Sequence, residues 1–235
     1  MHTQVYLVGA GPGDPELLTL RAVKCIALAD FILYDYLVDE RTLQYAKKGA
    51  KLAALSRPHT KQAEINRQMI EAAQSGQIVV RLKGGDPHIF GRLNEETQAL
   101  RNAGVSYEVV PGITSASAAA QIADISLTDR RYASAAALIT GHLSHEHDPT
   151  LPVLDFGQFA DFPGTLVFYM GIVTVKHWSE SLLQGGMSPD TPVRFIYNAT
   201  LAGQRIVSAM LGNAAETVER ESLQSPCIVI VGKGL

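Results

Sequence analysis

In the first half of the chain, short apolar runs alternate with segments whose apolar residues recur at helical spacing. The apolar runs predict buried strands over residues 5–8, 31–34, 51–55, 78–82 and 107–110. The amphipathic segments predict helices over residues 15–29, 39–47, 61–74 and 95–103. Strand and helix in this order are typical of βαβ units, so we expect an α/β fold with a largely parallel sheet.

A Pro-Gly pair at residues 111–112 marks the best candidate boundary in the chain. It separates an N-terminal α/β domain, residues 1–112, from a C-terminal α/β domain, residues 113–235. In the second domain, apolar runs predict about four strands, at residues 135–139, 165–169, 193–197 and 227–231. Helices are predicted at residues 115–122, 173–183 and 210–220, and a long exposed loop at residues 143–161.

Composition excludes several classes of protein. With 235 residues, 46% of them hydrophobic, the chain can bury a full core in one large or two modest domains. A net charge of -3 and scattered basic residues argue against a nucleic-acid partner. The first residues show no leader pattern, and no apolar run approaches the length of about 18 residues that predicts a membrane span. We therefore expect a soluble cytoplasmic protein.

The two cysteines support the same compartment. Cys25 and Cys227 are too far apart for a CxxC motif, and each lies in an apolar segment. Two reduced thiols in the core are typical of a cytosolic protein.

A glycine-rich loop, VGAGPGDP, follows the first predicted strand. Its spacing is G-x-G-x-G and not the G-x-G-x-x-G that cradles a dinucleotide pyrophosphate. Pro12 also lacks the N–H that a phosphate would require. Asp30 or Asp35 lies where a ribose-binding acid is found, so this criterion alone does not exclude NAD. A purely structural turn and a loop for a less anionic, nucleotide-like ligand both remain open.

A second glycine-rich loop, RLKGGDP, follows the strand predicted at residues 78–82. It therefore lies at the carboxyl end of the sheet, where open α/β folds bind ligands. Adjacent glycines, Gly84 and Gly85, allow a flat ligand to approach the backbone closely. Asp86 would repel a phosphate and attract a cation, and the spacing is not that of a phosphate-binding P-loop. A structural turn is the alternative.

The remaining polar motifs each have a simple structural explanation. His142, His145 and His147 have metal-like spacing, but they lie in a loop with no regular element to orient them. Solvated polarity is favoured, and we expect no metal site. Arg92 and Glu95 either form a local ion pair or bind substrate. The arginines at 130–131 are either solvated or meet carboxylates.

Several motifs, in one order along nearly the whole chain, resemble the tetrapyrrole methylases. They are VGAGPGDPELLTLRA (8–22), ADFILYDYLV (29–38), EINRQMIEAAQSGQIVVRLKGGDPHIFGR (64–92), VVPGITSASAAA (109–120), LTDRRYASAAALITGH (127–142), GTLVFYMG (164–171), YNATLAGQRIV (197–207) and SPCIVIVG (225–232). The resemblance implies a homodimer of two α/β domains, with S-adenosylmethionine bound in the cleft between them. It also implies methyl transfer to C2 and C7 of uroporphyrinogen III, which gives precorrin-2 by way of precorrin-1.

The resemblance also assigns residues to roles. The methyl donor would contact Pro12, Gly84, Gly85, Asp86, Ile89, Thr114, Ser115, Met170, Ala199 and Cys227. The tetrapyrrole would contact Asp35, Phe90, Arg92, Glu95, Arg130, Tyr169 and Met170. Arg92 is favoured as the residue that helps a proton leave, with Asp35 and Glu95 as alternatives, although arginine is a poor base at its normal pKa.

The chain departs from the family pattern at several points. Leu93 and Asn94 replace two glycines that usually follow Arg92, and His88 stands where an aromatic or aliphatic residue is more usual. Further departures fall at residues 55–58 and at Asp129. These changes bear on substrate identity and rate more than on fold. A methylase of a later precorrin, an NAD-dependent oxidoreductase and a binding protein without turnover remain as alternatives.

Overall fold

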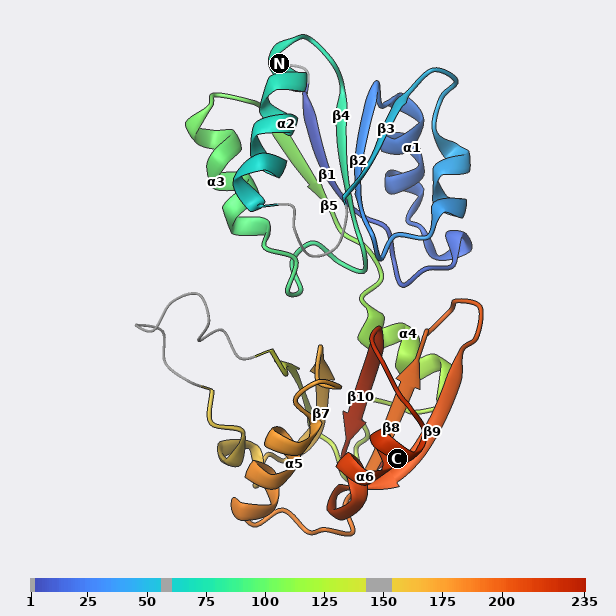
Figure 1. Ribbon diagram of the computed structural model, residues 1–235, viewed down its shortest axis with the longest axis vertical. Helices are drawn as coiled ribbons and strands as arrows, with labels where there is room; N and C mark the ends of the chain where they lie inside the picture. The colour runs from blue at the N-terminus through green and yellow to red at the C-terminus, as the bar shows by residue number, and fades with distance from the viewer. Residues whose placement is uncertain (1–2, 56–60, 143–153) are drawn as a thin grey trace. The chain divides into compact units, whose positions relative to one another are not determined.

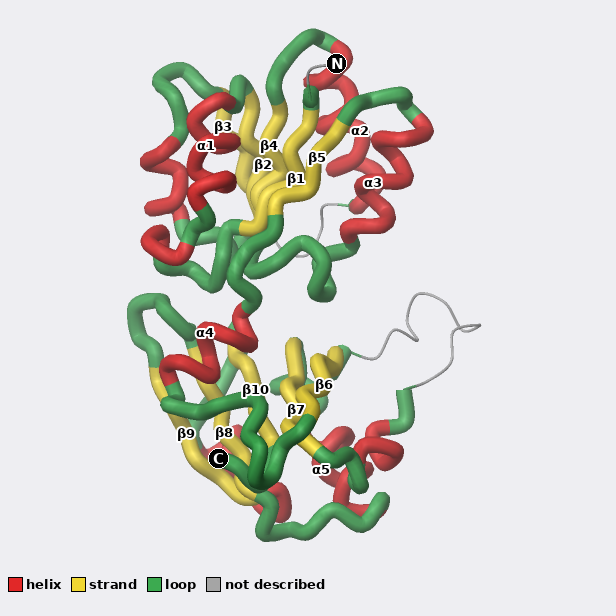
Figure 2. The backbone as a smooth tube through the Cα atoms, turned by 180° about the vertical axis from the view of Figure 1, so that it is seen from behind, coloured by secondary structure: helices red, strands yellow, loops and turns green. Residues whose placement is uncertain are grey.

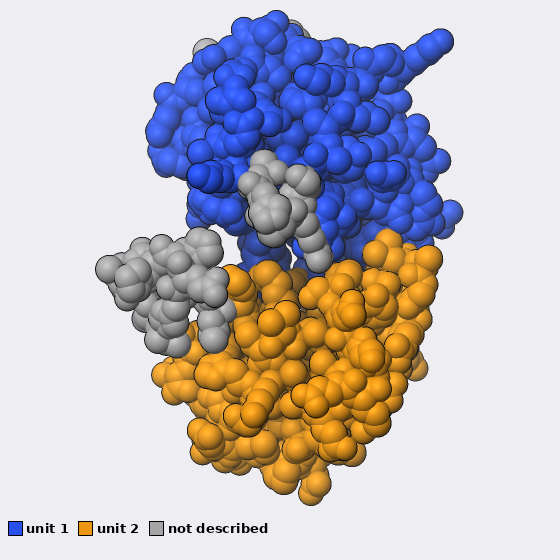
Figure 3. All heavy atoms as spheres, viewed as in Figure 1, with its two compact units in different colours: residues 1–115 blue, residues 116–235 orange. Residues whose placement is uncertain are grey.

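The chain folds into two compact units, unit 1 (Met1–Ser115) and unit 2 (Ala116–Leu235), which are coloured separately in Figure 3. The computed structural model describes residues 3–55, 61–142 and 154–235. The predicted domain boundary, after residue 112, lies three residues before the division at 115. Each unit contains one five-stranded sheet (Figure 1).

The sheet of unit 1 is parallel throughout, as the alternation of strand and helix predicts. Its strand order is β3-β2-β4-β1-β5. The strands are β1 (Val5–Gly9), β2 (Phe31–Asp35), β3 (Lys51–Leu55), β4 (Val79–Lys83) and β5 (Tyr107–Val110). The central strand β4 and its neighbour β1 are buried along almost their whole length, because helices cover both faces of the sheet.

The helices of unit 1 divide between the two faces of this sheet (Figure 2). On one face, α1 (Leu20–Leu28) packs its buried Ile26 against Ile32 and Leu82. On the other face lie α2 (Gln62–Gln74) and α3 (Leu93–Asn102). Alternate residues of each strand therefore enter different cores.

Two helix predictions in unit 1 were wrong in detail. The segment predicted as one helix over residues 15–29 forms a short 3₁₀ helix, Pro15–Leu17, and then α1. The Thr19 hydroxyl accepts a hydrogen bond from the Ala22 N–H at 3.1 Å, so the α-helix has its own N-cap and starts there. The helix predicted at residues 39–47 is the 3₁₀ helix η2, Glu40–Tyr45, capped by the Asp39 carboxylate.

Unit 2 has a mixed sheet with the strand order β6-β7-β10-β8-β9. Its strands are β6 (Ala135–Thr140), β7 (Gly164–Tyr169), β8 (Pro192–Tyr197), β9 (Arg205–Met210) and β10 (Cys227–Val231). β6 runs parallel to β7, whereas β10 is antiparallel to both β7 and β8. β9 was not predicted, because this edge strand is largely exposed and its sequence lacks a continuous apolar run.

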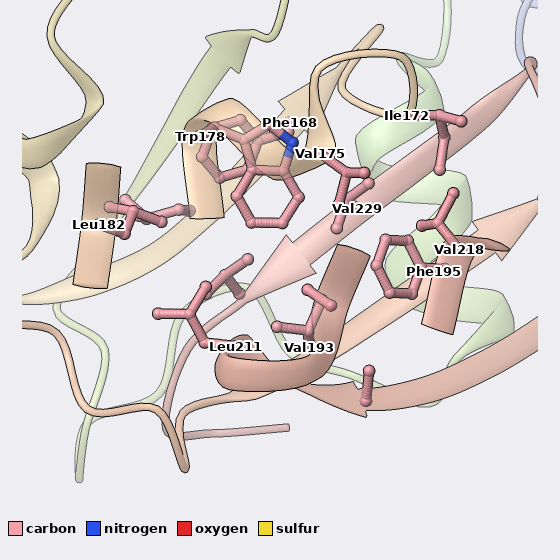
Figure 4. Close-up of a cluster of buried hydrophobic side chains, with 14 of the residues drawn as sticks. Phe168, Ile172, Val175, Trp178, Leu182, Val193, Phe195, Leu211, Val218 and Val229 are labelled. Atoms are coloured by element: carbon pink, nitrogen blue, oxygen red, sulfur yellow. The ribbon is translucent and has the colours of Figure 1, made fainter. Parts of the chain in front are cut away.

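The core of unit 2 lies between this sheet and the helices α5 (Val175–Gln184) and α6 (Ala214–Arg220) (Figure 4). The rings of Phe168 and Trp178 stack at 4.6 Å between centroids. The Trp178 indole N–H donates to the Gly171 carbonyl oxygen at 2.8 Å, which ties the turn after β7 to α5. A further helix, α4 (Ser115–Ile122), presents four buried alanines. Among the described residues, none of the helices combines the length and apolarity that a membrane span requires.

Candidate active site

The predicted site residues of unit 1 gather at one edge of its sheet. Because all five strands are parallel, their carboxyl ends meet at the same edge. β1 leads into Pro12, β2 ends at Asp35, β4 leads into Gly84, and β5 is followed by Thr114 and Ser115. These are the positions at which open α/β sheets bind their ligands.

The two glycine-rich loops are joined to each other by their backbones. The Gly11 N–H donates to the Gly85 carbonyl at 3.2 Å, and the Gly85 N–H donates to the Gly11 carbonyl at 2.7 Å. The first loop continues toward α1 on one face of the sheet, and the second continues toward α3 on the other. The joined loops therefore lie at a topological switch point, between β1 and β4.

Three glycines allow the loops to approach this closely. A Cβ on Gly9 would lie 2.6 Å from the Gly112 nitrogen and 2.7 Å from the Gly85 oxygen. A Cβ on Gly112 would overlap the same Gly85 oxygen and lie 2.9 Å from the Gly9 Cα. The backbones of three strand-end segments are thus in contact where any side chain would separate them.

The Asp86 carboxylate fastens the second loop to the segment after β5. One oxygen accepts from the Gly112 N–H at 3.0 Å. The other accepts from the His88 N–H at 2.7 Å and lies 2.9 Å from His88 Nδ1. An anionic group in this position disfavours a phosphate ligand and favours a cationic one.

Arg92 and Glu95 form a bidentate ion pair at the start of α3. Nε and Nη2 of Arg92 lie 2.7 Å from the two carboxylate oxygens, and both side chains are about half exposed. The hydrogen bonds to Glu95 raise the pKa of Arg92, and those from Arg92 lower the pKa of Glu95. The guanidinium therefore stays protonated and the carboxylate ionised at neutral pH.

The loop that carries this pair has a strained backbone. Phe90 and Arg92 both have left-handed conformations, with φ values of 52° and 53°. Gly91 between them packs tightly, since a Cβ there would lie 2.5 Å from the Pro87 oxygen. Non-glycine residues in this conformation gather at functional sites, where the surrounding structure holds them.

Behind this loop lies a group of four charged residues, here called the buried ion cluster: Arg81 and Lys83 on β4, Glu96 on α3, and Asp35 at the end of β2. Glu96 pairs with Lys83 at 2.8 Å and with Arg81 at 3.1 Å. Arg81 also pairs with Asp35 at 2.5 Å. Burial lowers the pKa of Lys83, and the neighbouring Arg81 adds to the effect.

This cluster was not predicted from the sequence. Asp35 was expected to bind substrate, but no partner was predicted for Arg81, Lys83 or Glu96. A signal was present, because Arg81 and Lys83 alternate with buried apolar residues in a strand that is covered on both faces. Charged residues in such a strand require buried counter-charges.

Most of the predicted site residues of unit 2 meet at one edge of its sheet, whereas Arg130 lies in the turn that leads into the opposite, amino end of β6. Tyr169 ends β7, Ala199 follows β8, and Cys227 begins β10. β10 is antiparallel to its two neighbours, so its first residue lies beside their last ones. Cys227 is accordingly paired with Tyr197, the last residue of β8.

Individual residues of this edge differ in exposure. Met170 is 48% exposed and has a left-handed backbone with a φ of 55°. The Tyr169 hydroxyl is buried and accepts from the Ala116 N–H of α4 at 3.2 Å. Arg130 is exposed, and no ion pair joins it to a carboxylate in the described part of the chain, whereas Arg131 pairs with Asp129 at 3.0 Å.

The histidine motif can be followed only in part. His142 is described, whereas His145 and His147 lie outside the described residues, as do the departures at residues 56–58. Within residues 3–55, 61–142 and 154–235, no three His, Cys, Asp or Glu side chains are grouped so that they could hold a metal ion.

Together these features define an α/β protein of two units, and most of its predicted ligand-contacting residues lie at or just after one set of strand ends in each sheet. Comparison with known families identifies it further. Residues 4–215 match the tetrapyrrole (corrin/porphyrin) methylases, and the chain belongs to this family.

Relatives of known name match nearly the whole chain. The uroporphyrinogen-III C-methyltransferase of Priestia megaterium is 43% identical over 98% of this chain and 97% of its own. The siroheme synthase of Hahella chejuensis is 42% identical over 97% of this chain but 49% of its own. The chain thus spans about half the length of the siroheme synthases it matches, and nearly all of the methyltransferase.

Solved structures agree with the fold. A uroporphyrin-III C-methyltransferase of Thermus thermophilus, complexed with S-adenosylhomocysteine, has a TM-score of 0.84 and 40% identity, covering 98% of this chain and 97% of that one. A cobalt precorrin-4 methyltransferase of cobalamin biosynthesis has a TM-score of 0.86 and 28% identity, covering 97% and 94%. The predicted fold class, two α/β domains of the tetrapyrrole methylase type, is confirmed.

We expect Gly112→Ala to destabilise the protein by about 1–3 kcal/mol, because the added methyl group overlaps backbone atoms that have no room to move. Chemical denaturation measures the change. Gly232→Ala is the matched control, since its Cβ would meet Thr165 at an ordinary 3.5 Å. Equal stability of the two variants would contradict the close contact of the three backbones.

Both thiols are expected to be unreactive in the folded protein. Burial raises the pKa of Cys25 and raises that of Cys227 to about 12. At pH 8 only about one Cys227 thiol in 10,000 is then ionised. Iodoacetamide should label both cysteines after denaturation and neither before it, as mass spectrometry would show; rapid labelling of the native protein would contradict the burial.

The raised pKa of Cys227 also makes the free energy of unfolding depend on pH. Because the thiol has a higher pKa in the folded protein than the ordinary value of 9.0, its contribution to the free energy of unfolding is complete below pH 9. The contribution is lost as the pH rises from 9 toward 12.

Proposed function

We propose that the chain is an S-adenosylmethionine-dependent C-methyltransferase that methylates uroporphyrinogen III at C2 and C7, giving precorrin-2 by way of precorrin-1. The observation that carries the proposal is the 43% identity, over 98% of the chain, to an enzyme named for this activity. Precorrin-2 supplies the sirohaem, cobalamin and haem d1 branches of tetrapyrrole synthesis. The siroheme synthases among the relatives support a place on the first of these branches.

The strand ends of unit 1 fit the methyl donor. S-adenosylmethionine carries a sulfonium cation and no phosphate, so a loop in which Pro12 lacks an N–H and Asp86 is anionic suits it better than it suits NAD. The contact of Gly9, Gly85 and Gly112 leaves bare backbone at this edge. We assign donor binding to Pro12, Gly84, Gly85, Asp86, Ile89, Thr114 and Ser115 in unit 1, and to Met170, Ala199 and Cys227 in unit 2.

The remaining residues suit the tetrapyrrole. Uroporphyrinogen carries eight carboxylates, which arginine binds in bidentate fashion. Arg130 is exposed for such contacts, and Arg92 can exchange Glu95 for a substrate carboxylate. Phe90 and Met170 are 42% and 48% exposed and offer apolar surface to the macrocycle. We assign substrate binding to these four residues and to Asp35, Glu95 and Tyr169.

In the proposed reaction, the protein needs to supply little covalent chemistry of its own. When bound, S-adenosylmethionine supplies an electrophilic methyl group, and the pyrrole carbon that accepts it is electron-rich. The protein's task is to align the two and exclude water. Cys227, with a pKa of about 12, remains a neutral thiol and does not compete for the methyl group.

Loss of a proton from the methylated carbon requires an acceptor. We propose that Arg92, Asp35 and Glu95 serve this step, with Arg92 positioned by its pair with Glu95. While that pair is intact the raised pKa of Arg92 makes it a hydrogen-bond donor, so proton acceptance falls to a carboxylate or follows exchange of the pair. Asp35, held by Arg81, is the carboxylate with a fixed position.

We also propose a cellular compartment and an oligomeric state for the protein. Its relatives' biosynthetic role and its two free, buried cysteines support a cytoplasmic protein. Exposed apolar side chains, such as Ile206 and Met210 on the edge strand β9, support a homodimer. We assign residues 1–112 and 113–235 as its two domains, and no nucleic acid or membrane as a partner.

A mass measurement tests the activity. Incubation with enzymatically generated uroporphyrinogen III and S-adenosylmethionine should add two methyl groups to the tetrapyrrole. S-adenosylhomocysteine should bind in calorimetry and NAD should not. Binding without any mass gain would reject the activity and favour either a binding protein or a methylase of a later precorrin, for which the likeness to the precorrin-4 enzyme is the supporting observation. Binding of NAD alone would favour an oxidoreductase.

Replacement of Arg92 tests its role in turnover. Arg92→Ala should lower the rate by at least about 100-fold, because both substrate alignment and charge near the reacting carbon are lost. Affinity for S-adenosylhomocysteine should stay within about threefold. Arg101→Ala, on the exposed side of the same helix, is the matched control and should be fully active. Normal turnover in Arg92→Ala would remove this residue from the mechanism.

A further inference from the structure

Glu96 is the centre of the buried ion cluster. Its side chain is fully buried, yet it receives hydrogen bonds from three directions. Lys83 Nζ donates to both oxygens at 2.8 and 2.9 Å, and Arg81 Nε donates to one of them at 3.1 Å. The Gln62 amide of α2 adds a contact at 3.3 Å. Such a charge is tolerated in a protein interior only because every partner is present.

The pair between Lys83 and Glu96 closes a loop. Lys83 is the last residue of β4, and Glu96 lies in the first turn of α3. The segment between them, residues 84–95, carries most of the site residues proposed for unit 1. Its two ends are therefore joined by a buried charge-assisted contact, in addition to the chain itself.

The two halves of this segment are held differently. The first half is fixed without Glu96, by the paired backbones of Gly85 and Gly11 and by the bond from Gly112 to Asp86. The second half, residues 88–95, contains the left-handed Phe90 and Arg92. A strained backbone persists only where its surroundings hold it, and Glu96 follows this half directly.

Arg81 extends the same network to another strand. It lies on the face of the sheet that β4 shares with α2 and α3, and its guanidinium bridges Glu96 and Asp35. The cluster contains two cations and two carboxylates, so its formal charge is balanced. The Arg81 side chain thus couples the position of the Asp35 carboxylate to that of Glu96, which directly follows residues 88–95.

We propose that Glu96 is a positioning residue that holds residues 88–95, and through Arg81 the Asp35 carboxylate, in the arrangement that binds the tetrapyrrole. This inference rests on the proposed function for the identity of the ligand. Glu96 contacts neither ligand in this assignment and acts through Lys83 and Arg81. Its effect falls on Phe90, Arg92 and Glu95, the tetrapyrrole contacts proposed within residues 88–95. The cofactor half has anchors of its own, and so does Ile89, the donor contact within residues 88–95, because its N–H donates to the Asp86 carbonyl at 3.1 Å.

Glu96→Gln keeps the size of the side chain and removes its charge. In the unliganded variant, hydrogen exchange measured by mass spectrometry should be faster in peptides covering residues 88–95, and unchanged in those covering residues 5–11. The KM for the tetrapyrrole should rise about tenfold or more, because a loosened loop misplaces its contacts. The Kd for S-adenosylhomocysteine, measured by calorimetry, should change by less than about threefold.

Two further variants separate positioning from stability. Leu100→Val removes a methylene group from the buried apolar face of α3 and should lower the melting temperature without changing the ratio of KM to Kd. Lys83→Met with Glu96→Gln removes one charge of each sign, so it avoids an unpaired buried charge and serves if the single variant does not fold. It should show the same faster exchange and the same rise in KM.

Unchanged exchange and unchanged KM in a folded Glu96 variant would overturn the inference. So would a rise in KM matched by an equal rise in the Kd for S-adenosylhomocysteine, because both halves of the loop would then depend on Glu96. If the wild-type protein does not methylate uroporphyrinogen III, the proposed function fails, and hydrogen exchange still decides whether Glu96 holds residues 88–95.

Discussion

Contact between bare backbones at Gly9, Gly85 and Gly112 is the constraint on which the rest of unit 1 depends. It brings together the ends of β1, β4 and β5, and the paired hydrogen bonds between Gly11 and Gly85 follow from that approach. A parallel sheet places the strand ends at one edge, but it does not by itself join the loops that leave them. The glycines do this, and so the loops form one continuous surface of main-chain groups with Asp86 as its nearest charge.

The charged residues near that surface form two groups, an outer ion pair and the inner buried ion cluster. The outer pair, Arg92 and Glu95, is about half exposed and can exchange partners at little cost, as expected of a solvated ion pair. The inner cluster is balanced in formal charge and, apart from the partly exposed Asp35, is buried, so removing any one member would leave an uncompensated charge. In the proposed function, recognition of a polyanionic substrate is thus separated from support of the loop.

Much of the fold followed from the sequence, and the reasons for the failures are physical. The buried strands of unit 1 were predicted because both faces are covered, which makes their apolar runs continuous. β9 was missed because an edge strand has no such run, and the helix at residues 15–29 was predicted too long because the Thr19 cap was overlooked. The chemistry of the residues indicated the two glycine-rich loops, Asp86 and the pair of Arg92 and Glu95 as candidates, but the full set of site residues and their roles could be named only through family resemblance. The contacts among Arg81, Lys83 and Glu96 depend on which face of β4 packs against α3, and the sequence does not give this. Alternation along the strands was a partial guide, since residues 31, 33 and 35 of β2 and residues 79, 81 and 83 of β4 point to the same face of the sheet.

The place of β10 has a consequence for synthesis of the chain. This strand lies at the centre of the unit 2 sheet, between β7 and β8, yet it comes from residues 227–231. Unit 1 has all five strands by residue 110, and domains generally fold as they emerge from the ribosome. Unit 2 cannot join its two strand pairs, β6-β7 and β8-β9, until β10 is available to bridge them. Until β10 is made, β7 and β8 therefore each have an unpaired edge, although unit 1 already has all its strands, and such edges can pair with other chains.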